Sequence, residues 1–156
     1  MDEARRVVLR SAGATGVLAA ALAAGLLKPE RALAASWNKA AFDSKSAVDA
    51  LKNIGAANPQ ETGDIVIEAP QIAENGAVVP IEVTSKLPGT TSLAVLIEKN
   101  PFPLASQFRF MDGALPFVKV NVKMGESSIV RVVAEAGGKY YTATKEVKVT
   151  IGGCGG

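Results

Sequence analysis

The sequence predicts a mainly β protein: an immunoglobulin-like antiparallel β-sandwich with an N-terminal helix and a flexible C-terminal arm. Three observations predict this fold class. The hydrophobic spacing changes from helical to alternating after the first third of the chain. Seven short alternating segments then follow, with turn residues between them. The chain closes on a glycine-rich tail that holds its single cysteine.

The first 34 residues have the features of an export signal rather than of the mature fold. Arg5 and Arg6 precede an apolar, alanine-rich run over residues 12–27, and residues 32–34 supply a small-x-small cleavage motif. The paired arginines are similar to the twin-arginine pattern, although the ordinary secretion route stays open. The apolar run is short and weakly hydrophobic for a membrane span. We therefore expect residues 1–34 to be removed and no membrane anchor to remain.

The charge of the mature chain argues against a polyanionic partner. The full chain has 17 basic and 15 acidic residues, of which residues 1–34 hold five and three. The remaining 12 basic and 12 acidic groups cancel. The mild basicity thus belongs to the export signal, and we expect no nucleic-acid partner.

One amphipathic helix is expected at the start of the mature domain, which we place at residues 35–151. Apolar residues recur there at helical spacing, namely Ala47, Val48, Leu51 and Ile54. Ser44 or Asp43 is expected to cap its start, and Gly55 to end it. Residues 56–63 are expected to form a loop.

Seven strands are then expected from alternation of apolar and polar residues. They cover residues 65–67, 79–84, 92–98, 107–111, 118–124, 128–134 and 140–151. Pro80 favours an edge position or a bulge, because proline cannot donate to a sheet ladder. Gly137 and Gly138 predict a hairpin between the last two strands. Strands of this number and length indicate the sandwich.

The tail carries the candidate functional residue, Cys154, in an arm over residues 152–156. Four glycines flank it: Gly152, Gly153, Gly155 and Gly156. Glycine has no Cβ and adopts both signs of φ, so we expect the arm to be mobile and the thiol to be exposed. An exported chain with one cysteine cannot form an internal disulfide, so its thiol is expected to react with another molecule.

The rest of the sequence lacks the residues of an enzyme. It contains no histidine, which excludes Ser-His-Asp and Cys-His catalysis and removes the commonest metal ligand. The acidic residues show no spacing of a paired catalytic or metal site. We therefore expect no catalytic residue, no metal and no cofactor, and a protein that is not an enzyme.

Three interpretations of Cys154 stay open from the residues alone. The first is a carrier whose thiol is processed by other enzymes. The second is a periplasmic structural or interaction protein whose Cys154 forms an intermolecular disulfide, and the third is a thiol oxidoreductase. Phe102, if exposed, could also belong to a partner surface.

Three stretches carry a resemblance to a known family: residues 74–80, residues 98–105 and the ending over residues 147–156. Together they resemble SoxY, the sulfur-carrier subunit of the bacterial Sox thiosulfate-oxidation system. The resemblance spans the mature chain and includes the export signal. The terminal Gly-Gly-Cys-Gly-Gly is its most specific part.

The resemblance implies a periplasmic carrier that holds its cargo on Cys154, at the end of a swinging arm. A haem c-containing SoxAX complex would join Cys154 oxidatively to the outer sulfur of thiosulfate, which gives a cysteine S-thiosulfonate. SoxB would hydrolyse off sulfate, and SoxCD, where present, would oxidise the remaining sulfane sulfur. The resemblance also implies a heterodimer with SoxZ, and a disulfide-linked dimer through Cys154 is possible.

Overall fold

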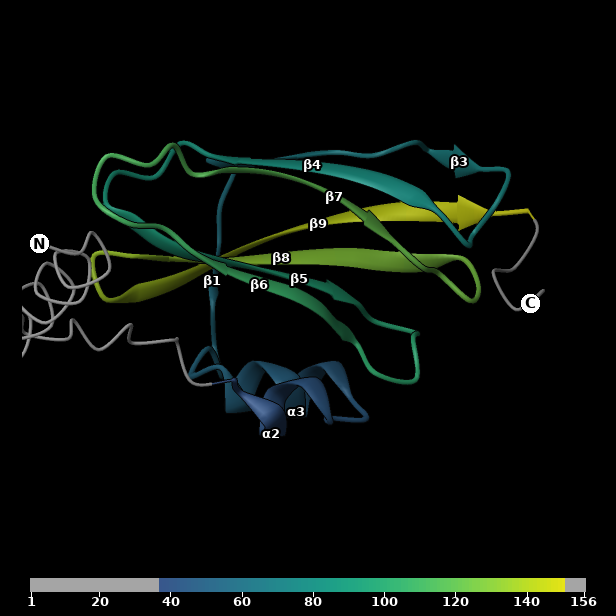
Figure 1. The fold of residues 1–156 in the computed structure, drawn as a ribbon, viewed down its shortest axis with the longest axis horizontal. Coiled ribbons are helices and arrows are strands. Elements are labelled where there is room, and N and C mark those ends of the chain that lie inside the picture. The colour runs from purple at the N-terminus through teal and green to yellow at the C-terminus, as the bar shows by residue number, and fades with distance from the viewer. Residues whose placement is uncertain (1–36, 151–156) are drawn as a thin grey trace, which may run out of the picture. The chain divides into compact units, whose positions relative to one another are not determined.

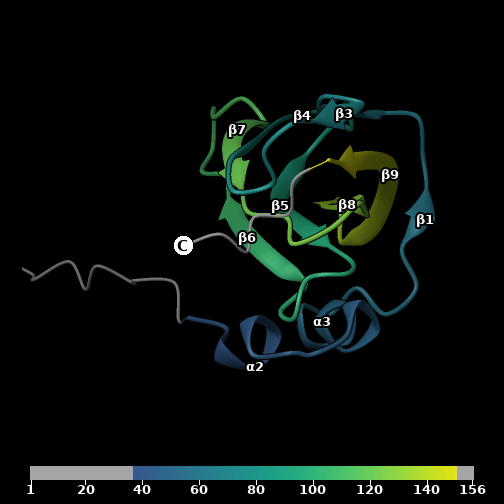
Figure 2. The same cartoon turned by 90° about the vertical axis from the view of Figure 1, so that its right-hand side faces the viewer.

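The computed structural model describes residues 37–150 of the 156-residue chain. The predicted export signal, the predicted carrier arm and Cys154 lie outside this range. The described residues form two facing β-sheets with two short helices on the outer side of the larger sheet (Figures 1 and 2). The predicted mainly β sandwich is confirmed.

Nine strands and two helices make up the described part of the chain. The helices are α2 (Lys39–Phe42) and α3 (Ala47–Asn53). The strands are β1 (Gln60–Glu61), β2 (Ile65–Glu68), β3 (Ile72–Ala73), β4 (Val79–Ser85), β5 (Thr90–Ile97), β6 (Leu104–Arg109), β7 (Phe117–Val122), β8 (Ser128–Ala136) and β9 (Lys139–Val149).

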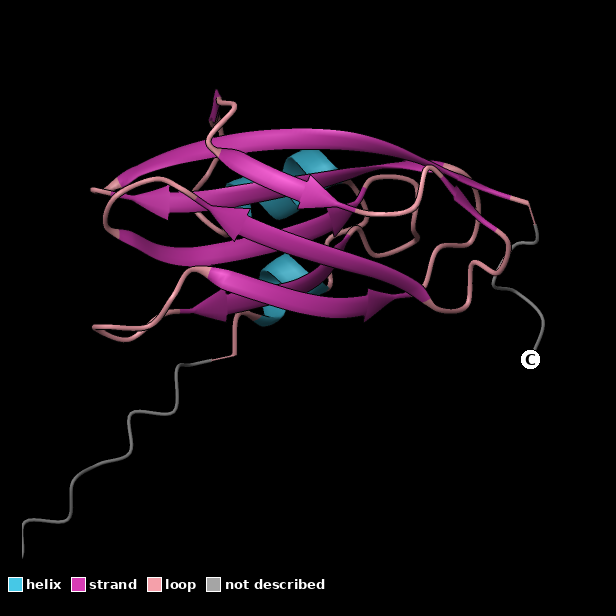
Figure 3. Ribbon diagram, turned by 90° about the horizontal axis from the view of Figure 1, so that it is seen from above, coloured by secondary structure: helices cyan, strands magenta, loops and turns pink. Residues whose placement is uncertain are grey.

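The larger sheet has the order β1-β9-β8-β5-β6, and β3 also pairs with β9. The smaller sheet has the order β2-β4-β7. The pairs within both sheets are antiparallel, except that β1 and β3 run parallel to β9. Figure 3 shows the long strands of the two sheets extending across the molecule, with the helices behind them.

The main core lies between the two sheets. Alternation places every second residue of each strand on the inner face, and fifteen buried residues pack there, including Ile81, Leu93, Val95, Met124 and Val132. The alternation that predicted β4 and β5 is confirmed, because every second residue of each strand is inaccessible to solvent, namely Val79, Ile81, Val83, Leu93, Val95 and Ile97.

A second core lies between the larger sheet and the helices. Ala94, Leu96 and Val133 project from the outer face of the sheet and pack against the helical residues Ala50 and Leu51. Strand β5 is therefore buried on both faces, although alternation alone predicts one buried face.

The predicted helix is confirmed as α3, but its predicted cap is wrong. Ser46 is the N-cap, and its Oγ accepts a hydrogen bond from the backbone N–H of Asp49 at 3.1 Å. Ser44 is buried instead, where its Oγ donates to the Ala40 carbonyl, and Asp43 ends α2. Val48 is also not on the buried face, since it is 60% exposed.

All seven predicted strands are confirmed, with small changes of bounds. The strand expected at residues 107–111 is β6, which begins earlier, at Leu104, and ends at Arg109. The hairpin prediction is also confirmed, because Gly137 and Gly138 join β8 to β9 with φ values of 56° and 74°. Two strands were not predicted: β1, inside the expected loop, and β3.

Pro80 does not place its strand at an edge, because β4 is the middle strand of the smaller sheet. However, β2 pairs with β4 only from Glu82 to Ser85, so only β7 lies beside Pro80. A residue without an N–H donor is tolerated there because β2 has already ended. The register shifts of the described strands occur in β5, not at Pro80.

Candidate functional site: the base of the C-terminal arm

The chain leaves the sandwich at the end of β9, where β3 lies beside it (Figure 1). Lys148 donates its backbone N–H to the Gln71 carbonyl at 3.0 Å, and Thr150 donates to the Ala73 carbonyl at 3.1 Å. The Thr150 hydroxyl adds a bond to the Glu74 carbonyl at 3.2 Å. On this side, hydrogen bonds therefore hold the chain as far as Thr150, the last described residue.

The other side of the exit is held by a side chain. Strand β8 begins only at Ser128, opposite Val147, so the ladder offers no strand partner to Val149 on this side. The Ser127 hydroxyl takes that place, because it accepts the Val149 N–H at 2.9 Å. The predicted arm therefore starts from a point that two neighbouring segments hold.

Neither contact was predicted from the sequence. A two-residue parallel strand such as β3 leaves no alternating pattern, and a single serine in a turn carries no signal of its partner. The resemblance pointed to residues 74–80 without assigning them a role. In the structure, the backbone of Glu74 contacts the base of the arm.

Cys154 and its four flanking glycines lie outside the described residues, so their roles stay predictions. Covalent geometry nevertheless limits where the thiol can be. Four residues separate Thr150 from Cys154, and a fully extended chain covers at most ~3.6 Å per residue. The Cα atom of Cys154 is therefore within about 14 Å of that of Thr150.

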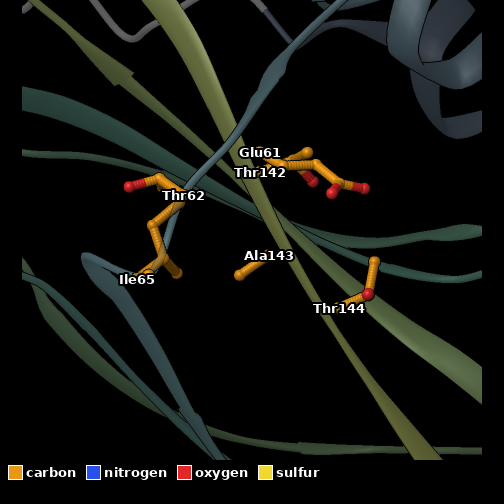
Figure 4. Close-up of a pocket in the computed structure, with 7 residues that line it drawn as sticks. Glu61, Thr62, Ile65, Thr142, Ala143 and Thr144 are labelled. Atoms are coloured by element: carbon orange, nitrogen blue, oxygen red, sulfur yellow. The ribbon is translucent and has the colours of Figure 1, made fainter.

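A polar cavity of about 510 Å³ lies between β1, the start of β2 and the middle of β9 (Figure 4). The lining residues are Glu61, Thr62, Gly63, Ile65, Thr142, Ala143 and Thr144. Thr144 precedes Thr150 by six strand positions, or roughly 20 Å along β9. This distance exceeds the reach of the Cys154 Cα atom, so the cavity lies apart from the base of the arm.

The charged residues of the described range form surface pairs rather than a catalytic group. Arg131 contacts Glu98 through Nε and Nη2, both at 2.7 Å, and holds β8 to the end of β5. The Glu82 carboxylate raises the pKa of Lys119 by hydrogen bonding and by its charge, across β4 and β7. Residues 37–150 contain no cluster of three or more potential metal ligands.

Phe102 is half-exposed, and the Lys45 ammonium lies over its ring, 3.4 Å from the ring centre.

The fold and the site thus define a class: an immunoglobulin-like β-sandwich that anchors a short C-terminal tail with one cysteine. The model of the family described as "Sulfur oxidation protein SoxY" matches residues 51–154. The chain belongs to the SoxY family. The prediction from the sequence is confirmed.

Solved structures agree with this assignment. The sulfur carrier protein SoxY from Chlorobium limicola f thiosulfatophilum is 39% identical, with a TM-score of 0.60. The match covers 66% of this chain and 94% of that chain. A search among curated proteins found no match.

A superoxide reductase (neelaredoxin) from Ignicoccus hospitalis has a similar fold, with a TM-score of 0.50. It is 21% identical, and the match covers 56% of this chain and 81% of that chain. At this identity the likeness concerns the fold alone. In the described part of this chain, no helix has the length and hydrophobicity that crossing a membrane requires.

Proposed function

We propose that this chain is a sulfur carrier of thiosulfate oxidation, with Cys154 as the point of covalent attachment and residues 152–156 as the carrier arm. The observation that carries the proposal is the family match, which continues past the end of β9 and ends at Cys154. The solved relative from Chlorobium is itself a sulfur carrier protein. The anchored exit of β9 supports a tail that is presented from a fixed point.

The loading step joins two sulfur atoms and is an oxidation. The Cys154 thiol and the outer sulfur of thiosulfate form a disulfide-type S–S bond, one proton is released, and two electrons pass to an acceptor. The resemblance assigns the role of acceptor to a SoxAX-type partner, whose haem c chemistry would take the two electrons one at a time. The product is a cysteine S-thiosulfonate.

The release step is a hydrolysis. Water attacks the sulfonate sulfur, the S–S bond to it breaks, sulfate and two protons leave, and a persulfide anion remains on Cys154. A SoxB-type hydrolase supplies the catalytic groups, and a SoxCD-type enzyme oxidises the remaining sulfur before a second hydrolysis frees the thiol. The chain itself stays a carrier without a catalytic centre of its own.

The cellular setting follows from the same proposal. Residues 1–34 serve as an export signal, by the twin-arginine route, and the mature chain works in the periplasm. It forms a heterodimer with a SoxZ-type subunit, and the twin-arginine route would let both folded chains cross together.

Mass spectrometry of the intact chain tests the attachment. We expect a thiosulfate-sized adduct on the peptide that contains Cys154 after incubation with thiosulfate and SoxAX. The Cys154→Ser variant is expected to fold and to gain no adduct. An unmodified wild-type chain under these conditions would overturn the proposal. A covalent dimer that forms without any adduct would favour the structural interpretation.

A further inference from the structure

The outer face of the larger sheet is covered over only part of its length. The helices pack on Ala94, Leu96 and Val133, and the Tyr140 hydroxyl donates to the Ile54 carbonyl at the end of α3. These residues lie on β5, on the second half of β8 and at the start of β9. Figure 1 shows the helices ending well before the C-terminal end of β9.

The uncovered part of this face holds two exposed isoleucines. Ile72 of β3 is 57% exposed and Ile129 of β8 is 39% exposed. Their strand neighbours Ala73, Ser128 and Val130 are buried in the interior. Because successive side chains point to opposite faces, both isoleucines project from the outer face.

Strand pairing places charged residues between the two isoleucines. Ile72 is in register with Lys148, and Ile129 is in register with Glu146. Both charged residues are exposed and alternate with the buried Val147 on β9. The isoleucines are therefore two strand spacings and two residues apart, or about 12 Å. We call Ile72, Ile129, Glu146 and Lys148 the arm-side surface.

The arm-side surface continues directly into the exit of the arm. Thr150 lies two residues after Lys148, just beyond the end of β9, and the Cα atom of Cys154 is within about 14 Å of its Cα atom. The thiol extends about 3 Å beyond that Cα and a bound sulfur about 2 Å further, so a catalytic group that reacts with this sulfur must come within roughly 20 Å of Thr150. An enzyme that encloses Cys154 therefore has to place its own surface against this end of the sandwich.

We propose that the arm-side surface is the docking site for the SoxB-type hydrolase that acts on the sulfur bound to Cys154. This inference rests on the proposed function. The partner that fits presents an apolar rim to the two isoleucines and opposite charges to Glu146 and Lys148. A contact centred on four residues is small and suits a complex that must separate after each turnover, because small interfaces are typical of transient encounters.

The test compares variants of the loaded full chain as substrates of SoxB, with sulfate release as the readout. For Ile72→Ser combined with Ile129→Ser, we expect KM to rise about tenfold and kcat to stay unchanged. Val48→Ser is the matched control, since Val48 is an exposed aliphatic residue on α3. An unchanged KM for the double variant, with wild-type hydrolysis, would overturn the docking site and leave the carrier function intact.

A charge variant keeps the test decisive if the double variant folds poorly. For Lys148→Glu we expect KM to rise about threefold at low salt, with the difference disappearing near 1 M salt because ions screen exposed charges. A KM equal to that of wild type at low salt would count against the docking site. A wild-type chain that never gains an adduct would overturn the carrier function and, with it, this inference.

Discussion

The two parts of the outer face of the larger sheet share strands β8 and β9 but differ in cover. Beneath the helices, Leu96 and Val133 are buried. Toward the C-terminal end of β9, Ile72 and Ile129 stay exposed. Apolar residues on one sheet face can therefore have two different roles. The covered ones stabilise the domain, and the uncovered ones are available for contact.

The largest expected effect is on the covered part. Leu96→Ala removes a fully buried side chain beneath the helices, and we expect the free energy of unfolding to fall by about 3 kcal/mol. Urea unfolding measures this change. Ile129→Ala on the uncovered part is the comparison, with an expected change of about 0.5 kcal/mol or less. Equal losses for the two variants would remove the distinction between the parts.

A smaller loss is expected where α3 ends against the sheet. Gly55 has a φ of 86°, and a Cβ there would come within 3.1 Å of the Tyr140 hydroxyl oxygen. Gly55→Ala should therefore lower the free energy of unfolding by about 1–2 kcal/mol, from backbone strain and crowding. Gly63→Ala is the control, because its Cβ would meet open space and Gly63 has no positive φ. A Gly55→Ala variant as stable as this control would contradict the prediction.

A local effect is expected at the uncovered end. Ser127→Ala removes the acceptor of the Val149 N–H, worth about 1 kcal/mol. Hydrogen exchange at Val149 should accelerate, while the strand centres stay protected. Ser106→Ala is the matched control, because the Ser106 hydroxyl is buried without a hydrogen-bond partner among the described residues. Unchanged exchange at Val149 would show that Ser127 does not hold the exit of β9.

The smallest expected effect is a dependence of stability on alkaline pH in the covered part. Burial raises the pKa of Tyr140 above its ordinary 10.0, with the Glu135 charge acting in the same direction. The contribution of Tyr140 to stability is therefore complete below its unfolded pKa and is lost as pH rises through the folded value. As the pH rises, the free energy of unfolding should fall more for wild type than for Tyr140→Phe. Parallel pH curves for both proteins would contradict this.

Most of the fold could be predicted because alternation is a local signal. Val79, Ile81 and Val83 identify the inner face of β4 from seven consecutive residues. Contacts between distant residues could not be predicted in this way. The pairing of β3 with β9 and the burial of Leu96 beneath α3 depend on which segments meet in space. The four-residue helix α2 is too short to show a helical period.

The same distinction between local sequence signals and contacts between distant residues applies to the candidate site. Cys154 stood out from the sequence because it is the single cysteine and has glycines on both sides. The contacts that anchor the end of β9 could not be predicted, because the roles of Ser127 and Ala73 are visible only in their hydrogen bonds with Val149 and Thr150. The exposed Ile72 and Ile129 were equally hidden, since their sequence neighbours give no indication that the helices leave this part of the face uncovered.

The pairing of β3 with the end of β9 also has a consequence for folding. The Thr150 hydroxyl and its partner, the Glu74 carbonyl, are 76 residues apart in the chain. Contacts of such long range form only after the chain between them has organised, since loop closure opposes them until then. An incompletely folded chain would offer a cysteine without the neighbouring sheet surface. Only the folded domain thus presents Cys154 together with the arm-side surface.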